Sequence, residues 1–298
     1  MIKCNLCPRG CNVNREKTLG YCKSGSFARV ARASLHMWEE PCISGKCGSG
    51  TVFFTGCNLG CVYCQNRKIS SGQSGKELTD SELSQVFIKL QKAGAHNINL
   101  VTPTHFVPQI INAISLARSN GLNIPIVYNT SGYETAETIK NLSGFVDIYL
   151  TDFKYMSTAL SKKYSNAPDY FEAAKTALYE MVSQVGTPIF DKYGIMESGV
   201  IVRHLVLPNC TDDSKSVIKY LYENYKNTIY ISVMNQFTPL EKLADYPELN
   251  RKITDEEYND IIDYALSLGI ENAFIQEGET QSESFIPDFE CGKFLDNI

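Results

Sequence analysis

Three closely spaced cysteines constrain this chain more than any other feature of its sequence. Cys57, Cys61 and Cys64 have the spacing C-x3-C-x2-C and follow the apolar run Thr-Val-Phe-Phe at positions 51–54. That run is short, β-branched and aromatic, so it predicts a buried strand, and the cysteines belong to the loop that leaves its end. Three thiolates this close together can bind one soft metal centre, and iron–sulfur clusters are held by thiolates.

A cluster with only three protein ligands has a chemical consequence. A cubane holds four irons, so three thiolates leave one iron open to an outside molecule. Such a site is catalytic rather than purely electron-carrying. The same cysteines could instead form a zinc knuckle or be scattered core residues. The order of strand, cysteine loop and repeated strand–helix units favours the cluster.

Strand and helix patterns alternate from residue 51 onward. A capping box at Thr79 and Glu82 opens a helix that ends at Gly94. Repeated βα units imply a parallel sheet, so we expect an α/β fold with a full or partial βα barrel. Strands are expected at 51–54, 98–101, 124–128, 146–150, 200–207, 228–233 and 272–276, and further helices at 110–117, 167–185, 211–225 and 254–268.

A second group of cysteines lies near the start of the chain. Cys4, Cys7, Cys11 and Cys22 are surrounded by glycine and proline, which predict loops rather than helix or sheet. Four thiolates complete a tetrahedral zinc site or a fully ligated four-iron cluster, and the sequence does not distinguish the two. A metal would also stabilise a segment too small to build its own core.

The residues that separate the two cysteine groups carry weaker signals. Residues 27–38 partly alternate, which predicts an edge strand or a connector. His36 and the following Glu39 and Glu40 could be functional, but solvated or structural roles are favoured. Cys42 and Cys47 are either additional ligands or ordinary packed cysteines.

Charge is distributed unevenly along the chain. The net charge is −5, but residues 1–50 hold eight Lys and Arg against three Glu, a balance of +5 that leaves −10 for the remainder. The positive charges of this segment are scattered singly, which argues against a nucleic-acid partner and favours cations beside an anionic cluster or substrate. We expect a Cys-rich metal-binding N-terminal extension at residues 1–50 and a barrel domain at residues 51–298.

Composition restricts the compartment. No apolar run approaches the roughly 20 residues that a membrane helix needs, and the N-terminal sequence Met-Ile-Lys-Cys has no signal-peptide pattern. Without an export signal, eleven cysteines in tight clusters indicate metal ligands in a reducing compartment rather than disulfides. We therefore expect a cytoplasmic protein that does not contact a membrane.

Polar residues recur at the ends of the expected strands. In βα barrels, ligands bind where the strands run into their following loops. Polar side chains at successive strand ends can surround one cofactor with hydroxyl, amide and charged groups. These residues are Thr102, Thr104, His105, Asn129, Thr130, Ser131, Asp152, Lys154, Arg203, His204, Asn209, Asn235, Gln236, Gln276 and Glu277.

The cysteine motif resembles the signature of the radical S-adenosylmethionine (SAM) superfamily, including the aromatic Tyr63 just before the third cysteine. In that family the unique iron of a [4Fe-4S] cluster holds the amino and carboxylate groups of SAM. One electron from the cluster cleaves SAM and gives a 5′-deoxyadenosyl radical. The resemblance implies that Cys57, Cys61 and Cys64 hold the catalytic cluster. It also implies SAM as a cofactor, a flavodoxin- or ferredoxin-type reductant and an open, partial (β/α)6 barrel.

Over essentially the whole chain, the sequence is similar to activases of glycyl radical enzymes. Among these it most resembles the uncharacterised proteins related to pyruvate formate-lyase activating enzyme. The likeness lies in the early cysteines, the cysteine motif, and the segments Trp-Glu-Glu-Pro, Val-Thr-Pro-Thr-His and Tyr-Asn-Thr-Ser-Gly-Tyr-Glu. It implies that Tyr63 contacts the adenine, that Asn129 and Ser131 lie near the ribose or methionine, that Asp152 and Lys154 line the SAM or cation site, and that His204 lies near the methionine end.

One segment departs from the activase pattern. Many activases have Gly-Gly-Glu after the second strand to hold the SAM amino group, whereas this chain has Thr-Pro-Thr at 102–104. The hydroxyls of Thr102 and Thr104 can accept that hydrogen bond, but they carry no charge. We therefore assign both threonines to the SAM site.

The sequence thus predicts a radical SAM enzyme that abstracts hydrogen from a substrate. The substrate could be a glycine of a glycyl radical enzyme, another peptide or a small molecule, and no catalytic residue is assigned beyond the cofactor ligands. Two alternatives come from other classes. An iron–sulfur electron-transfer protein would hold a cluster without responding to SAM, and a zinc-stabilised binding module would be colourless.

Overall fold

The computed structural model describes residues 3–72, 74–240, 242–276, 289, 294 and 295. Its centre is one large sheet with the strand order β10-β9-β8-β6-β5-β4-β2-β1-β3. From β2 to β10 the strands lie in the same order in space as in the sequence, and every neighbouring pair is parallel. These strands are β2 (Ser49–Phe54), β4 (Ile98–Val101), β5 (Ile126–Thr130), β6 (Ile148–Asp152), β8 (Met196–Leu205), β9 (Tyr230–Met234) and β10 (Ala273–Ile275).

The remaining strands are antiparallel additions. β1 (Ala28–His36) pairs with both β2 and β3 (Lys76–Leu78), and the two-residue β7 (Ile189–Phe190) pairs with β8. The expected edge strand at 27–38 is therefore a strand, but β3 rather than β1 forms the edge. Because β2 begins at Ser49, the domain boundary expected at residue 50 falls inside a strand of the sheet. Among the described residues, those before the sheet are 3–27.

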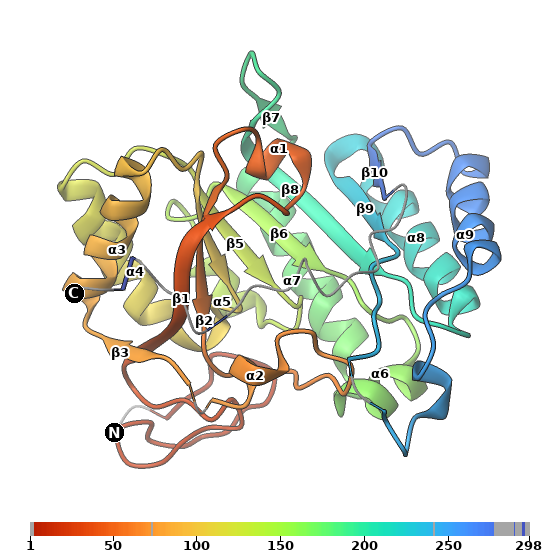
Figure 1. Cartoon of the computed structure of the whole chain (residues 1–298), viewed down its shortest axis with the longest axis horizontal. Coiled ribbons are helices and arrows are strands. Elements are labelled where there is room, and N and C mark those ends of the chain that lie inside the picture. The colour runs from red at the N-terminus through yellow and green to blue at the C-terminus, as the bar shows by residue number, and fades with distance from the viewer. Residues whose placement is uncertain (1–2, 73, 241, 277–288, 290–293, 296–298) are drawn as a thin grey trace.

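The long helices connect the parallel strands and lie outside the curved sheet. Figure 1 shows α3 and α4 beyond one end of the sheet and α8 and α9 beyond the other. The α-helices are α1 (Pro41–Ser44), α2 (Arg67–Ser70), α3 (Asp80–Lys92), α4 (Val107–Ser119), α5 (Ala136–Lys140), α6 (Thr158–Ser165), α7 (Tyr170–Val185), α8 (Thr211–Tyr225) and α9 (Asp255–Ser267); short 3-10 helices cover Thr104–Phe106, Lys226–Thr228 and Pro247–Leu249.

The predicted helix after Thr79 shows how the sequence sets these elements. The Thr79 side chain accepts a hydrogen bond from the Glu82 amide, and the Glu82 carboxylate accepts one from the Thr79 amide, so the predicted capping box is confirmed. The residues Leu83, Val86, Phe87 and Leu90 recur at helical spacing and are completely buried. Each such side chain stabilises the fold by about 2 kcal/mol.

The two faces of the sheet differ in chemistry. On the outer face, apolar side chains such as Leu100, Tyr128 and Val202 pack into the main core with the helices. On the inner face, α1 packs Cys42 and Ile43 into a second apolar cluster with Val127, Ile148, Leu150, Met196 and Ile201. This cluster fills the inner face near the starts of β6 and β8, and it shows that Cys42 is a packed core cysteine. Cys47 is exposed.

The α/β fold with a mostly parallel, barrel-like sheet is confirmed. Its parallel strands place their carboxyl ends along one rim of the sheet, which is where the polar residues of the sequence pattern occur. Glu277, the last of those residues, lies outside the described residues.

Candidate functional site

The cysteine loop leaves the carboxyl end of β2, as its apolar strand predicts. Cys57, Cys61 and Cys64 are half-buried and free of disulfides. The Leu59 amide donates a hydrogen bond to the Cys57 Sγ at 3.3 Å. Gly56 begins the turn with φ +90°, and a Cβ there would lie 2.3 Å from the Cys22 carbonyl oxygen. Only glycine therefore allows the N-terminal segment to approach the cysteine loop so closely.

The three thiols lie close enough to influence one another electrostatically. Burial raises the pKa of Cys57, and the neighbouring Cys61 raises it further. Burial raises the pKa of Cys64 to about 12, with further increases from Cys57 and Cys61. The Lys154 ammonium opposes both shifts, which places a cation beside the thiols. A metal centre replaces the thiol protons, so this donor set suits thiolate ligation.

The spacing of the thiols bears on the kind of metal centre. Within the described part of the chain, no three His, Cys, Asp or Glu side chains are arranged to hold a single metal ion. A cubane binds each thiolate at a different iron, so its ligands stand farther apart than those around one ion. Three neighbouring thiols beside a lysine are a donor set of the kind that holds a four-iron cluster.

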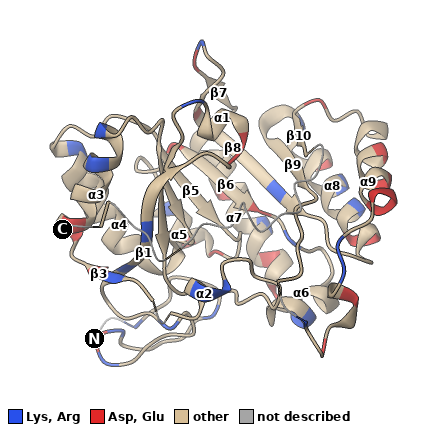
Figure 2. Ribbon diagram, viewed as in Figure 1, with Lys and Arg blue, Asp and Glu red and all other residues tan. Residues whose placement is uncertain are grey.

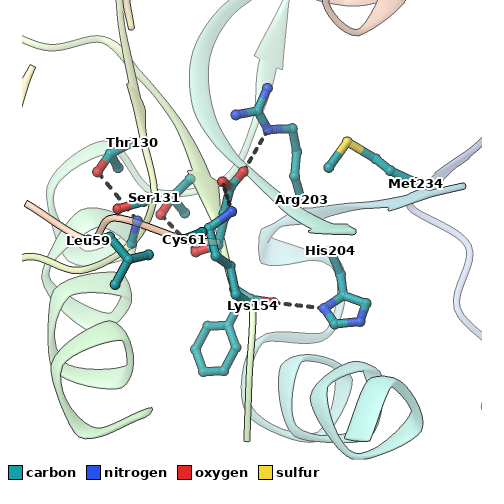
Figure 3. Close-up of polar contacts among 12 residues, drawn as sticks. Leu59, Cys61, Thr130, Ser131, Lys154, Arg203, His204 and Met234 are labelled. Atoms are coloured by element: carbon teal, nitrogen blue, oxygen red, sulfur yellow. Dashed lines mark hydrogen bonds and ion pairs between the residues drawn. The ribbon is translucent and has the colours of Figure 1, made fainter. Parts of the chain in front are cut away.

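A charged network occupies the ends of the next strands. The Lys154 Nζ lies 2.6 Å from one Asp152 carboxylate oxygen, and the Arg203 Nε lies 3.0 Å from the other. Arg203 also donates from Nη2 to the Asn129 Oδ1 at 2.6 Å. Figure 3 shows Lys154 and Arg203 in this arrangement near Cys61. The structure thus brings three predicted site residues together, with Arg203 as their link.

The network fixes the ionisation of its members. Burial alone would raise the pKa of Asp152, but Lys154 and Arg203 lower it below its ordinary value. Burial alone would lower the pKa of Lys154, but Asp152 raises it above its ordinary value. All three groups are therefore charged at neutral pH.

Two glutamates from the N-terminal side of the sheet complete this network. The Glu39 carboxylate lies 3.3 Å from the Arg203 Nη1 and accepts a hydrogen bond from Asn99 at 3.0 Å. Burial raises the pKa of Glu39 and of Glu40, while Arg203 opposes both shifts. Of the roles expected for these glutamates, the solvated one is wrong, because both side chains are largely buried, and the contacts of Glu39 with Asn99 and Arg203 are structural. The sequence did contain signals for this buried network. Glu39 and Glu40 are adjacent acids before an apolar strand, and Arg203 lies within another strand.

Other predicted SAM contacts are placed as follows. Thr102 directly follows β4 and has φ +57°, a left-handed conformation that is strained for a β-branched residue and is typical of functional sites. Thr104 is buried and donates its hydroxyl to the Glu134 carboxylate at 2.6 Å. The Ser131 Oγ is buried without a hydrogen-bond partner among the described residues. A buried hydroxyl without a partner fits a ligand contact.

Tyr63 and His204 use their polar atoms within the protein. The Tyr63 hydroxyl lies 2.7 Å from the Tyr155 hydroxyl. His204 bonds to the Phe153 carbonyl through Nδ1 and to the Ser214 hydroxyl through Nε2, and burial lowers its pKa to about 4. Figure 3 shows it pointing away from Arg203, toward a helix. The adenine and methionine contacts assigned to these two residues stay predictions.

The N-terminal cysteines also approach one another. A Cβ on Gly20 would lie 3.5 Å from the Cys22 Sγ and 3.7 Å from the Cys11 Sγ. Burial raises the pKa of Cys7 to about 12, and Cys22 and Cys11 add to this shift; Cys4 similarly raises the pKa of Cys22. Cys7 therefore lies within electrostatic reach of Cys11 and Cys22, and Cys22 lies within reach of Cys4.

The N-terminal segment is docked on the rim that carries the site. The Arg15 guanidinium bonds to the His105 carbonyl, and the Leu6 carbonyl accepts a hydrogen bond from Thr138 at 2.8 Å. Figure 2 shows basic residues along this segment and on α2, whereas α9 carries acidic residues. Among the described helices, none has the length and apolar character needed to cross a membrane.

The chain is similar to several known proteins. Residues 51–221 match the model of the Radical SAM superfamily. An uncharacterised protein of Methanocaldococcus jannaschii is 31% identical over 272 residues, covering 88% of this chain and 74% of that protein. The pyruvate formate-lyase-activating enzyme of Clostridium pasteurianum is 24% identical over 220 residues, covering 70% of this chain and 84% of that enzyme. A crystal structure of Streptococcus suis SuiB bound to precursor peptide SuiA aligns with a TM-score of 0.48 at 12% identity, covering 75% of this chain and 47% of that one.

Proposed function

The chain belongs to the radical SAM superfamily, and we propose that it cleaves SAM at a [4Fe-4S] cluster held by Cys57, Cys61 and Cys64. The observation that carries this proposal is the set of three neighbouring thiols in the loop after β2, with the Lys154 ammonium close enough to act on two of them. When bound, the cluster supplies one electron that splits SAM into methionine and a 5′-deoxyadenosyl radical, which abstracts hydrogen from the substrate.

The neighbouring strand ends would orient SAM. Its methionine end carries an ammonium and a carboxylate, and the rim offers both charges, from Asp152 on one side and from Lys154 and Arg203 on the other. The Ser131 hydroxyl and Thr102 supply uncharged contacts. Because these groups are held by ion pairs before SAM arrives, little ordering is needed on binding.

For the substrate, we propose a polypeptide, with a glycine of a glycyl radical enzyme as the specific case. Support comes from the whole-chain resemblance to activases and from the relative named as a pyruvate formate-lyase-activating enzyme. A flavodoxin- or ferredoxin-type protein would deliver the electron. Other peptides and small molecules are the competing substrates, which an assay with partner proteins separates.

For the N-terminal extension, we propose a second [4Fe-4S] cluster on Cys4, Cys7, Cys11 and Cys22. Four neighbouring thiols can complete such a cluster, and the couplings of Cys7 with Cys11 and Cys22 and of Cys22 with Cys4 support their convergence.

The test is anaerobic reconstitution followed by metal analysis and reaction with SAM. Two clusters predict about eight irons per chain, and the catalytic cluster alone about four. After reduction, 5′-deoxyadenosine should form and be detected by chromatography. An iron-loaded protein that forms no 5′-deoxyadenosine would instead be an electron carrier, and a protein that takes up only zinc would contradict the catalytic proposal.

A further inference from the structure

A hydroxyl group bonds directly to one catalytic thiol. Ser165, the last residue of α6, is buried and donates from Oγ to the Cys61 Sγ at 3.0 Å. The contact bridges two segments far apart in sequence, and the Val62 amide reinforces it by donating to the Tyr164 carbonyl at 2.9 Å. No sequence motif marks Ser165, since it lies in a helix separate from the cysteine loop.

Two tyrosines extend this bond into a chain with a defined direction. The Ser165 Oγ lies 2.8 Å from the Tyr155 hydroxyl, which lies 2.7 Å from the Tyr63 hydroxyl. A serine hydroxyl carries one hydrogen, and that hydrogen is used toward the sulfur. Tyr155 must therefore donate to Ser165, and Tyr63 must donate to Tyr155. Each donor polarises the next, which strengthens the last bond to Cys61.

A hydrogen bond to a ligating sulfur changes the redox properties of the centre. Reduction adds negative charge that spreads onto the thiolates, so a donor to sulfur stabilises the reduced state more than the oxidised state. Hydrogen bonds to the sulfurs are among the main determinants of iron–sulfur potentials. The Ser165 bond should raise the potential of a cluster on Cys61.

One guanidinium holds both sides of this contact. Arg9 donates to two carbonyls of the catalytic cysteine loop and to two at the end of α6: Asn58 at 2.8 Å, Leu59 at 2.9 Å, Ser165 at 3.0 Å and Asn166 at 2.5 Å. A planar guanidinium with five donors is suited to such a fourfold contact, which lysine could not reproduce. Arg9 thereby fixes the distance between Ser165 and the loop that carries Cys61.

Arg9 itself belongs to the N-terminal cysteine segment. It lies between Cys7 and Cys11, and its guanidinium stacks on the Tyr21 ring at 4.0 Å, next to Cys22 in the sequence. A metal on these cysteines would restrain the loop on both sides of Arg9. Loss of that metal would free the backbone that anchors the guanidinium.

We propose that Ser165 is a positioning residue that sets the reduction potential of the catalytic cluster, and that Arg9 makes its hydrogen bond depend on the N-terminal metal centre. The inference rests on the proposed function, because it needs both metal centres. By this coupling the N-terminal cysteine segment would control catalysis without contacting SAM.

The first test compares Ser165→Ala with Ser161→Ala in reconstituted protein. Ser161 lies on the same helix, is buried and donates to the Thr158 carbonyl, so it controls for losing a buried hydroxyl. Redox titration followed by electron paramagnetic resonance gives the potential. Ser165→Ala should lower the equilibrium constant for reduction about tenfold, which is about 59 mV for one electron. Tyr155→Phe should give a smaller shift of the same sign, and Ser165→Thr should restore the potential.

An unchanged potential in Ser165→Ala, in a protein that keeps its cluster and its circular dichroism, overturns the role of Ser165. An equal shift in Ser161→Ala overturns it as well. If Ser165→Ala does not fold, Tyr155→Phe and Ser165→Thr still decide the question. The first keeps the aromatic ring at position 155, and the second keeps a side chain at least as large as serine at position 165. Formation of 5′-deoxyadenosine by the unaltered protein separates failure of this inference from failure of the proposed function.

The second test examines coupling through Arg9. Arg9→Met should shift the potential in the same direction as Ser165→Ala, and the double variant should shift no further than the larger single shift. Cys22→Ala, which removes an N-terminal ligand, should also lower the potential of the catalytic cluster. Lys17→Met, at an exposed cation of the same segment, is the control. Additive shifts in the double variant, or no shift in Cys22→Ala, would overturn the coupling.

Discussion

Arg203→Met tests how the buried charges of the site are balanced. Arg203 lies within 3.3 Å of Glu39 and 3.0 Å of Asp152, and its side chain is 15% exposed. Without the guanidinium, Glu39 and Glu40 lose the cation that opposes their desolvation, and Asp152 keeps only Lys154. Removing one partner of a buried pair costs about 3–5 kcal/mol. We expect the free energy of unfolding to fall by that amount at pH 7.

The pH dependence gives this prediction a second, independent signature. Asp152 has a lowered pKa in the folded state, so its contribution is present at neutral pH and is lost as the pH falls through that folded pKa. Glu39 has a raised pKa, so its burial destabilises the fold at neutral pH and ceases to do so once it is protonated. Both effects make the loss caused by Arg203→Met smallest in acid.

Denaturant unfolding at pH 7 and near pH 4, followed by circular dichroism, measures both quantities. The control is Lys215→Met, which breaks the surface pair of Lys215 and Asp260 at 2.7 Å and should cost less than about 1 kcal/mol. A loss for Arg203→Met no larger than that of the control, or one that does not shrink in acid, would refute the reasoning.

Three further changes have defined outcomes. Cys61→Ala should abolish the catalytic cluster and SAM cleavage while the N-terminal metal remains; metal analysis that finds both centres lost would contradict independent sites. Gly56→Ala places a Cβ 2.3 Å from the Cys22 carbonyl at φ +90°. It should therefore expose the N-terminal segment to limited proteolysis, and an unchanged cleavage pattern would argue against close docking. His204 has its pKa lowered to about 4. Its neutral form thus stabilises the fold above the unfolded pKa of about 6.5, and this contribution declines as the pH falls toward 4. His204→Gln should lose that part of the pH dependence in unfolding measurements, and an unaltered profile would contradict it.

The parts of the fold that were predicted correctly are those with a local sequence pattern. The parallel strands were visible as short apolar runs, and the capping box at Thr79 marked the start of a helix. The edge of the sheet was misplaced because β3, which pairs with β1 and forms that edge, was not predicted. It has only three residues and no apolar pattern of its own. Helix α6 was missed because it is short and polar on its exposed side.

The site residues that belong to one motif or to a strand end could be predicted from the sequence. Those that meet from distant segments could not. The three cysteines of the loop and Lys154 follow strands and Asp152 ends one, so position along the chain identified them. Glu39 meets Arg203 across 164 residues of sequence, and Ser165 reaches Cys61 from a helix 104 residues away. Such contacts depend on the curvature of the sheet, which no local pattern encodes.

The most direct test of the account is the formation of 5′-deoxyadenosine by anaerobically reconstituted, reduced protein supplied with SAM, measured beside Cys61→Ala. We predict 5′-deoxyadenosine from the unaltered protein and none from the variant. An iron-loaded protein that leaves SAM intact, or a Cys61→Ala variant that still cleaves it, would contradict the assignment of the catalytic cluster to this loop.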